Sequence, residues 1–290
     1  MVTLSIIVLT YNSSKYISNC LESIIEKYAT EIKNNAIELI VADNDSTDTT
    51  IKNAEKYEKF GVKIVDNKKN LGFAKGINEA VRKTHGKYLL FLNPDAHLAE
   101  GNVRGIIDIF EKDDLVGVVG GKLVDFNGKN ELSCARQYSL PRVFFLAVGL
   151  DNILGNRFSP SKQKEVASVS GGFMAVKASL FEKLHGFDEN FFMYVEDIEF
   201  CLRVRRVGYK VVFTPALKVK HLGQGSSNRS FAITNIYKGL LYLHKKHYSK
   251  FSYGMVKLLL IIKARILVLV GKILDNKNLM STYKDALKSI

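Results

Sequence analysis

Acidic side chains stand at several points where an apolar run of the sequence gives way to polar residues. Asp43 and Asp95 each follow such a run. Asp197 lies in the acidic cluster VEDIE, between Glu196 and Glu199. A single carboxylate can hold a divalent cation or accept a ligand hydrogen, and crowded carboxylates raise one another's pKa. A raised pKa suits a general base, so we expect proton abstraction by Asp197, with Glu196 as its nearest competitor.

The segment LNPDAH (92–97) and a later histidine are candidates for metal binding. Asp95 with the nearby Asn93 offers hard oxygen ligands, which suit Mg²⁺ or Mn²⁺ beside phosphate oxygens. A simple Asn-Pro-Asp turn would account for the same residues without a ligand. His221, which follows FTPALKVK, could add an imidazole nitrogen, although a lone histidine is more often structural.

Two further segments could bind a nucleotide. In VADNDSTDTT (41–50), Asp43 could accept the N3–H of a uracil or thymine ring, whereas Ser46 and Asp48 are expected to cap a helix. The glycine-rich NLGFAKGIN (70–78) offers close backbone approach, a helix N-terminus and the cation of Lys75 to a diphosphate. A purely structural turn is an equal alternative, because the segment is neither GxGxxG nor a Walker sequence.

The elements that must position these residues alternate between strands and helices in the first half. Such alternation predicts βαβ units and a parallel sheet, whose ligands bind at the carboxyl ends of the strands. The polar clusters fall at these ends. Strands are predicted at 4–12, 37–44, 62–67 and 87–93, and helices at 14–27, 47–57 and 73–83.

The second half is less regular. Residues 136–165 are poor in signals, and we expect a long, mobile loop on the acceptor side there. Elsewhere the patterns predict a strand and turn over 116–128, a strand then a helix over 168–187, a helix from about 197 to 208, and one or two strands over 210–223.

Composition excludes several classes of protein. With 290 residues, 47% of them hydrophobic, the chain can form a full core in one large domain or two small ones. Its three scattered cysteines argue against a disulfide framework or a structural zinc site. The first strand begins so close to Met1 that we expect no secretory signal. An NAD-binding Rossmann protein is disfavoured because GxGxxG is missing.

Positive charge is concentrated at the end of the chain. Residues 1–200 carry 24 Lys and Arg against 27 Asp and Glu, whereas residues 201–290 carry 18 against 2. This asymmetry favours an anionic membrane surface as partner, the alternative being a solvated basic surface. Within 255–274, Lys263 and Arg265 make a membrane span costly, so we expect a helix lying in the membrane surface. A helix packed on the catalytic body or on another subunit is the alternative.

Taken in order, the segments resemble the inverting glycosyltransferases of family 2, in particular the rhamnosyltransferase-like enzymes of bacterial cell-surface polysaccharides. The resemblance implies an α/β fold of the GT-A type, with a mostly parallel sheet, over residues 1–225. Residues 226–290 would form a helical basic extension. The segments that carry the resemblance are SIIVLTYN (5–12), VADNDSTD (41–48), NLGFAKGIN (70–78), FLNPDA (91–96), residues 170–209 and VKHLG (219–223).

The resemblance also implies residue roles. Asp95 is the last position of the family's DxD motif and would bind metal and diphosphate, although Asn93 replaces the first Asp and removes a charge. Asp197 would be the catalytic base and His221 a second metal ligand. The QxxRW signature of processive synthases is missing, which favours transfer of one sugar. Residues that would line the nucleotide-sugar site are Thr10, Asn12, Asp43, Asn70, Gly72, Lys75, Asn78, Asn93 and Gly172.

The function expected from the resemblance is metal-dependent, inverting transfer of one sugar from a dTDP-rhamnose-type or UDP-hexose-type donor. The acceptor would be a hydroxyl of a lipid-linked or surface glycan. The enzyme would be cytoplasmic, peripheral at the inner face of the membrane and possible as a homo-oligomer, with no nucleic-acid partner. A sugar nucleotidyltransferase and a non-catalytic sugar-nucleotide-binding or membrane scaffold protein are the alternatives.

Overall fold

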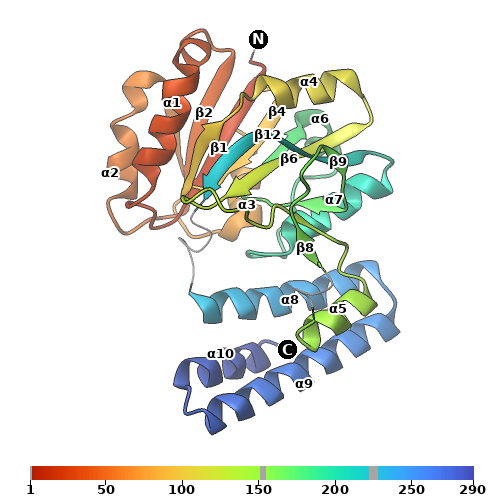
Figure 1. Cartoon of the computed structure of the whole chain (residues 1–290). Helices are drawn as coiled ribbons and strands as arrows, with labels where there is room; N and C mark the ends of the chain where they lie inside the picture. The colour runs from red at the N-terminus through yellow and green to blue at the C-terminus, as the bar shows by residue number, and fades with distance from the viewer. Residues whose placement is uncertain (1, 151–154, 222–227) are drawn as a thin grey trace.

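The computed structural model describes residues 2–150, 155–221 and 228–290. Its main sheet, as far as these residues define it, has nine strands in the order β3-β2-β1-β4-β11-β6-β12-β5, with β9 paired to β12. Figure 1 shows helices around this sheet and a separate layer of helices beneath it. The strands of the main sheet are β1 (Leu4–Thr10), β2 (Ile37–Asp43), β3 (Val62–Asp66), β4 (Tyr88–Leu92), β5 (Ala96–Glu100), β6 (Val116–Val124), β9 (Lys164–Glu165), β11 (Phe173–Lys177) and β12 (Lys210–His221).

The predicted parallel arrangement is confirmed for the first half of the chain. Strand β1 lies parallel to both β2 and β4, and β2 lies parallel to β3. The other half mixes directions, because β11 runs antiparallel to β4 and β6, while β12 runs parallel to β6 and antiparallel to β5. A small second sheet joins β7 (Cys134–Ala135), β8 (Arg157–Phe158) and β10 (Ser168–Val169).

Two apolar clusters cover the two faces of the sheet. Along β1, Ile6 and Val8 belong to one cluster and Ile7 to the other, as the alternation of side chains in a strand requires. The first cluster includes α1 and α4, and the second includes α3, α6 and α7. The helices of this body are α1 (Ile17–Lys33), α2 (Thr50–Glu55), the 3₁₀ turn η1 (Glu58–Phe60), α3 (Gly72–Val81), α4 (Arg104–Lys112), α5 (Leu140–Ala147), α6 (Ala178–Lys183) and α7 (Glu196–Arg206).

Several predicted boundaries need correction. Helix α1 begins three residues later than expected and continues to Lys33, because its buried apolar side chains extend to Ile32. The helix expected over 47–57 is reduced to Thr50–Glu55, since the polar residues before it form hydrogen bonds with the loop after β1. Strand β5 was not expected from the sequence.

The prediction of a long loop over 136–165 is wrong for its first part. Helix α5 occupies Leu140–Ala147, with a proline in its first turn, where the missing N–H costs no hydrogen bond. Val143 is fully buried, and the carbonyl oxygen of Leu146 accepts a hydrogen bond of 2.6 Å from Lys263 Nζ. The helix was missed because its apolar side chains are buried by partners far along the chain. Residues 151–154 of the expected loop lie outside the described residues.

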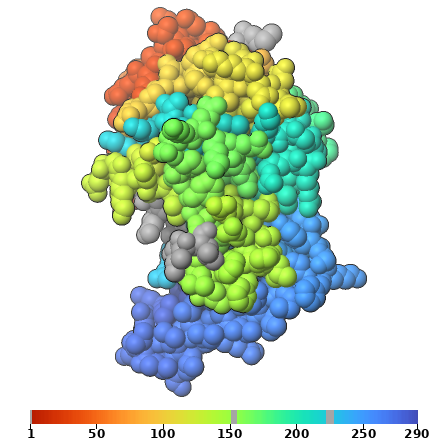
Figure 2. Space-filling view, turned by 45° about the vertical axis from the view of Figure 1, so that its right-hand side comes forward, coloured from red at the N-terminus to blue at the C-terminus, as the bar shows by residue number. Residues whose placement is uncertain are grey.

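The C-terminal segment forms three helices, α8 (Arg229–His247), α9 (Lys250–Ile273) and α10 (Lys277–Lys288). In Figures 1 and 2 they form the foot of the molecule. Buried residues of all three belong to the apolar cluster that contains α7, so the foot and the catalytic body share one core. No helix among the described residues is long and apolar enough to cross a bilayer.

A buried charge cluster joins the foot to helix α7. Glu199 is completely buried, and its carboxylate lies 2.9 Å from Arg203 on the same helix. From the end of α8, Lys246 and His247 each place a nitrogen 2.8 Å from Glu199. A buried carboxylate needs such partners, so the last turn of α8 completes the environment of α7.

Candidate active site

Strand pairing brings the predicted metal ligands together. Asp95 immediately precedes β5, and the first residue of that strand, Ala96, pairs with His221 at the end of β12. The Nε2 atom of His221 lies 3.4 Å from Asp95 Oδ1 and 3.0 Å from Asn93 Nδ2. Asn93 is fixed in turn, because its backbone N–H donates to the carbonyl of Gly172 across 3.1 Å.

Glu131, which the sequence did not single out, orients His221. Its Oε2 atom lies 3.0 Å from His221 Nδ1, so the ring donates its Nδ1 hydrogen there and keeps a lone pair on Nε2. A carboxylate on the far nitrogen of a ligating histidine is a common arrangement in metal sites. Asp95 and His221 therefore fit a divalent cation as a pair of ligands. The described residues contain no cluster of three or more such ligands, so phosphate and water would have to complete the coordination.

The two candidate bases start helix α7. Asp197 is half-buried and accepts hydrogen bonds from the backbone N–H of Gly171 at 3.0 Å and of Ile198 at 2.8 Å. Burial raises the pKa of Asp197, opposed by these backbone donors and by the charge of Arg157. Burial raises the pKa of Glu196 well above its ordinary value, and the charge of Asp197 raises it further.

These environments separate the roles of the two acids. The carboxyl Oε2 of Glu196 is buried and has no hydrogen-bond partner. Asp197 has donors on both oxygens, which favour its charged form. In the pair, Asp197 is therefore the acid that ionises first, and its carboxylate is the one that can accept a proton.

Asp197 faces the same cavity as the predicted metal ligands. The cavity has a volume of about 460 Å³. Arg157, from β8, adds positive charge to its wall, and no sequence pattern indicated this residue, because it lies in the irregular region before β10. The predicted site residues that line this cavity are Asn93, Asp95, Gly172, Glu196, Asp197 and His221.

A second cavity of about 380 Å³ adjoins the first, and Asn93 lines both. Gly72 lies in its wall with a φ of +76°, and a Cβ there would come within 2.2 Å of the carbonyl oxygen of Phe192. Only glycine fits this position, which brings helix α3 against the segment before α7. Thr10, Asn70 and Gly72 are the other predicted residues in the wall, and Tyr11, Asn44 and Phe73 are lining residues that the sequence did not indicate.

Four predicted nucleotide-site residues do not line either cavity as the described residues define them. Asp43 is fully buried, and its carboxylate accepts hydrogen bonds from Thr10 Oγ1 and from both the backbone N–H and the hydroxyl of Ser46, each at 2.7 Å. Asn12 accepts from the backbone N–H of Thr47 at 2.9 Å. Both residues therefore hold the loops after β1 and β2 together.

Lys75 and Asn78 lie on helix α3 and point toward the loop before α7. Lys75 Nζ is 2.8 Å from Glu189, and Lys75 is thus paired with a carboxylate in this structure. Asn78 is buried and exchanges two hydrogen bonds with the backbone of Phe187, at 2.8 and 2.9 Å. Its observed role is to anchor the turn that leads into the acidic cluster.

Residues 5–185 match the profile of glycosyl transferase family 2, and residues 156–224 match a profile described as the N-terminal domain of galactosyltransferase. The first match spans more than half of the chain, so the protein belongs to glycosyl transferase family 2. It is an enzyme that transfers a sugar from a nucleotide sugar.

The chain is also similar to two rhamnosyltransferases in sequence and to one solved structure in fold. It is 25% identical to the N-acetylglucosaminyl-diphospho-decaprenol L-rhamnosyltransferase of Mycobacterium tuberculosis, with 78% of each chain covered. It is 29% identical to rhamnosyltransferase WbbL of Escherichia coli, over 53% of this chain and 59% of that protein. The mannosyltransferase PcManGT from Pyrobaculum calidifontis, solved with GDP-Man and Mn²⁺, has 17% identity and a TM-score of 0.60 over 99% of this chain and 85% of its own. The fold is GT-A, as expected.

Proposed function

We propose that this enzyme transfers one rhamnosyl residue, with inversion, from a nucleoside-diphosphate sugar to a hydroxyl of a lipid-linked glycan. The observation that carries the mechanism is that Asp197 faces the same cavity as Asp95 and His221. The choice of sugar and acceptor rests on the rhamnosyltransferase relatives, one of which is named for a diphospho-decaprenol acceptor.

The reaction follows from the environment of Asp197. Its carboxylate takes the proton from the acceptor hydroxyl, and the freed oxygen attacks the anomeric carbon of the donor. A bond forms between these two atoms while the bond from the anomeric carbon to the diphosphate oxygen breaks on the opposite face. The raised pKa of Asp197 makes its carboxylate a stronger base, which favours removal of the proton from the acceptor hydroxyl.

Asp95 and His221 are proposed to hold Mg²⁺ or Mn²⁺, with Glu131 fixing the ring of His221. When bound, the cation would neutralise charge that develops on the leaving diphosphate. Arg157 adds a protein cation to the same cavity. Asp43 supports the nucleotide side by holding the loop of Ser46, and its direct contact with a base stays a prediction.

Asp197→Asn tests the assignment of the base. The amide keeps the shape of the side chain but cannot accept the proton, so we expect the turnover number to fall by about 10²–10⁴-fold. Donor affinity should stay close to wild type, whereas thermal stability should fall somewhat, because the amide nitrogen would face one of the two backbone N–H donors. The matched control is Asp108→Asn, which removes a surface carboxylate paired with Arg104 on α4. Turnover of the Asp197 variant at the control's rate would exclude this residue as the base.

Helix α9 is proposed to hold the enzyme at an anionic membrane surface, on the cytoplasmic side. One face of the helix packs against α5, α8 and α10, while apolar side chains on another face are between 46% and 72% exposed. Lys257, Arg265 and Lys272 follow one another along the flank of this stripe, an arrangement typical of interfacial helices. The members of the stripe are Phe251, Leu258, Ile262, Ile266, Leu269 and Ile273.

Sedimentation with vesicles tests the membrane proposal. The wild-type protein should bind vesicles that contain phosphatidylglycerol, and Ile262→Glu with Leu269→Glu should abolish binding by placing charge in the apolar stripe. Leu115→Glu, at an exposed leucine outside the foot, is the control. Equal binding by the wild-type and doubly substituted proteins would contradict the proposal, as would a stable dimer that dissociates on substitution.

A further inference from the structure

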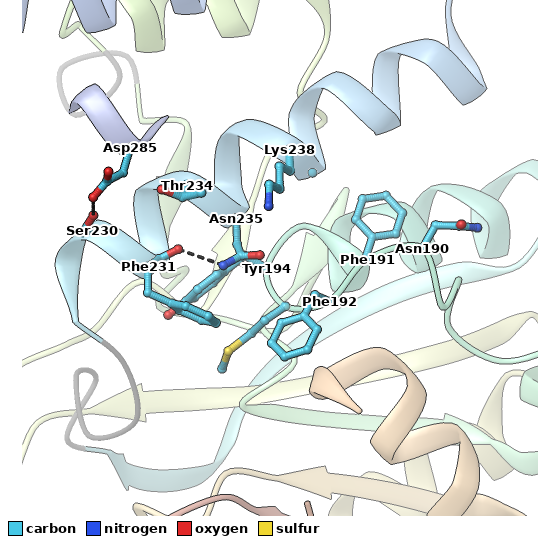
Figure 3. A pocket seen from close by; sticks show the side chains of 12 residues that line it. Asn190, Phe191, Phe192, Tyr194, Ser230, Phe231, Thr234, Asn235, Lys238 and Asp285 are labelled. Atoms are coloured by element: carbon cyan, nitrogen blue, oxygen red, sulfur yellow. Dashed lines mark hydrogen bonds between the residues drawn. The ribbon is translucent and has the colours of Figure 1, made fainter. Parts of the chain in front are cut away.

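A third cavity, of about 610 Å³, lies between the segment before α7 and the first turns of α8. Figure 3 shows the side chains of Phe192 and Phe231 close together at its wall, with Asn235 and Lys238 farther along α8. The described residues that line it are Asn190, Phe191, Phe192, Met193, Tyr194, Ser230, Phe231, Thr234, Asn235, Lys238, Gly239 and Asp285.

This cavity lies next to the active site and shares wall residues with it. Met193 lines all three cavities, and Tyr194 lines both this cavity and the one that contains Asp197. Phe192 and Phe231 separate it from the cavity of Thr10 and Asn70. Met193 and Tyr194 therefore border both this cavity and the one that contains Asp197.

The wall between the cavities is held in a strained backbone conformation. Tyr194 and Val195 have φ angles of +69° and +72°, a region that β-branched residues such as valine rarely adopt. Helix α8 packs closely against them, since a Cβ on Gly239 would come within 2.9 Å of the Val195 side chain. Strained residues of this kind cluster at ligand sites, where the surrounding structure enforces them.

The chemistry of the lining suits a sugar ring. Phe192 and Phe231 meet edge to face, with ring centroids 6.0 Å apart and an interplanar angle of 76°. Aromatic surface can pack on the C–H face of a sugar, while amides and hydroxyls bind its hydroxyl groups. Asn235 donates its Nδ2 hydrogen to the carbonyl of Phe231 at 2.9 Å, a bond that leaves its Oδ1 as an acceptor toward the cavity.

The charge of the lining also favours a sugar as the ligand. Of the described lining residues, Lys238 carries a positive charge and Asp285 a negative one, and Asp285 accepts a hydrogen bond from Ser230 at 3.2 Å. A diphosphate would require several cations, whereas this wall is close to neutral. A neutral, polar ligand with an apolar face is the better match.

We propose that this cavity binds a sugar unit of the acceptor glycan, next to the sugar whose hydroxyl reaches Asp197. The inference rests on the proposed function, since it assumes a glycan acceptor. Helix α8 would then help to select the acceptor through Thr234, Asn235 and Lys238. Tyr194 would lie between the two sugars.

The test measures acceptor binding by titration calorimetry on the full chain. The probes are two water-soluble lipid diphosphates with a short prenyl chain, one carrying a single N-acetylhexosamine and one carrying two. The wild-type protein should bind the disaccharide probe at least about tenfold more tightly than the monosaccharide probe. Thr234→Tyr, which fills the cavity, should remove this preference, and Lys238→Ala should reduce it.

Lys245→Ala is the matched control, because Lys245 is an exposed lysine of the same helix outside the cavity. Equal affinity of the wild type for both probes would overturn the inference. So would a loss in Lys238→Ala that is equal for both probes, since the site would then recognise the diphosphate. Failure of the proposed function is a separate result: absence of rhamnosyl transfer from dTDP-rhamnose, measured by release of the nucleoside diphosphate.

Discussion

The acidic residues on the two sides of the active site differ in their hydrogen-bond partners. On the nucleotide side, the carboxylate of Asp43 accepts three hydrogen bonds from Thr10 and Ser46 and is fully buried. On the side of the chemistry, a carboxyl oxygen of Glu196 is buried with no partner, and Glu196 and Asp197 have raised pKa values. Asp43 ends strand β2, whereas Glu196 and Asp197 begin helix α7.

The difference shows which acidic residues serve the fold and which serve the reaction. A carboxylate whose hydrogen bonds are satisfied internally stabilises its loop and has little left to offer a substrate. Asp197 has one backbone donor on each oxygen and a pKa that burial raises, so its carboxylate can still take up a proton from a substrate. Residue type alone does not distinguish these cases, because all three acids end apolar runs or start a helix in similar ways.

After Asp197→Asn, the largest effect is expected at Glu131, whose replacement distinguishes positioning of a metal ligand from direct metal binding. Glu131→Ala should raise the Mn²⁺ concentration for half-maximal activity by about 10–100-fold, because His221 loses the partner that fixes its ring. Turnover at saturating Mn²⁺ should largely recover, and Glu131→Gln should fall between. Glu182→Ala, at an exposed glutamate of α6, is the control. An unchanged Mn²⁺ requirement would argue against the assigned role of His221.

A stability effect is expected for Asp43→Asn. The amide nitrogen of asparagine would face the donors of Ser46, so we expect a loss of about 1–3 kcal/mol in the free energy of unfolding. Urea denaturation measures it, with Asp108→Asn as the control for loss of a surface carboxylate. Wild-type stability would contradict the structural role. A raised KM for the donor in the folded variant would support additional contact of Asp43 with the base.

The smallest effect concerns Glu196→Gln and the pH dependence of stability. The pKa of Glu196 is raised in the folded protein, so the folded state keeps a proton that the unfolded chain releases. The stability from this protonation is present below the ordinary pKa of the group and is lost as pH rises through the folded value. Glutamine cannot ionise, so the variant should gain in Tm relative to wild type as pH rises above the ordinary pKa of a glutamate. Parallel Tm curves would show that Glu196 titrates normally.

Much of the fold and part of the site could be predicted from the sequence. The apolar runs of β1, β2 and β4 marked the strands, and their polar ends marked Asn93 and Asp95 at the cavity. Glu131 and Arg157 could not be predicted, because their positions depend on pairings between segments far apart in the chain. Asp43 and Lys75 were expected at the ligand, but local hydrogen bonds and an ion pair decide where their side chains lie.

The charge cluster around Glu199 bears on how this enzyme could have evolved. At the end of α8, the ammonium group of Lys246 and the ring of His247 each lie 2.8 Å from the carboxylate of Glu199, which stands two residues after Asp197. Removing the foot would leave that carboxylate with only Arg203 as ion-pair partner among the described residues. The foot is thus not a module that can be exchanged independently of the catalytic body. A chimera that exchanges it between family members would have to carry the last turn of α8 along with the catalytic body.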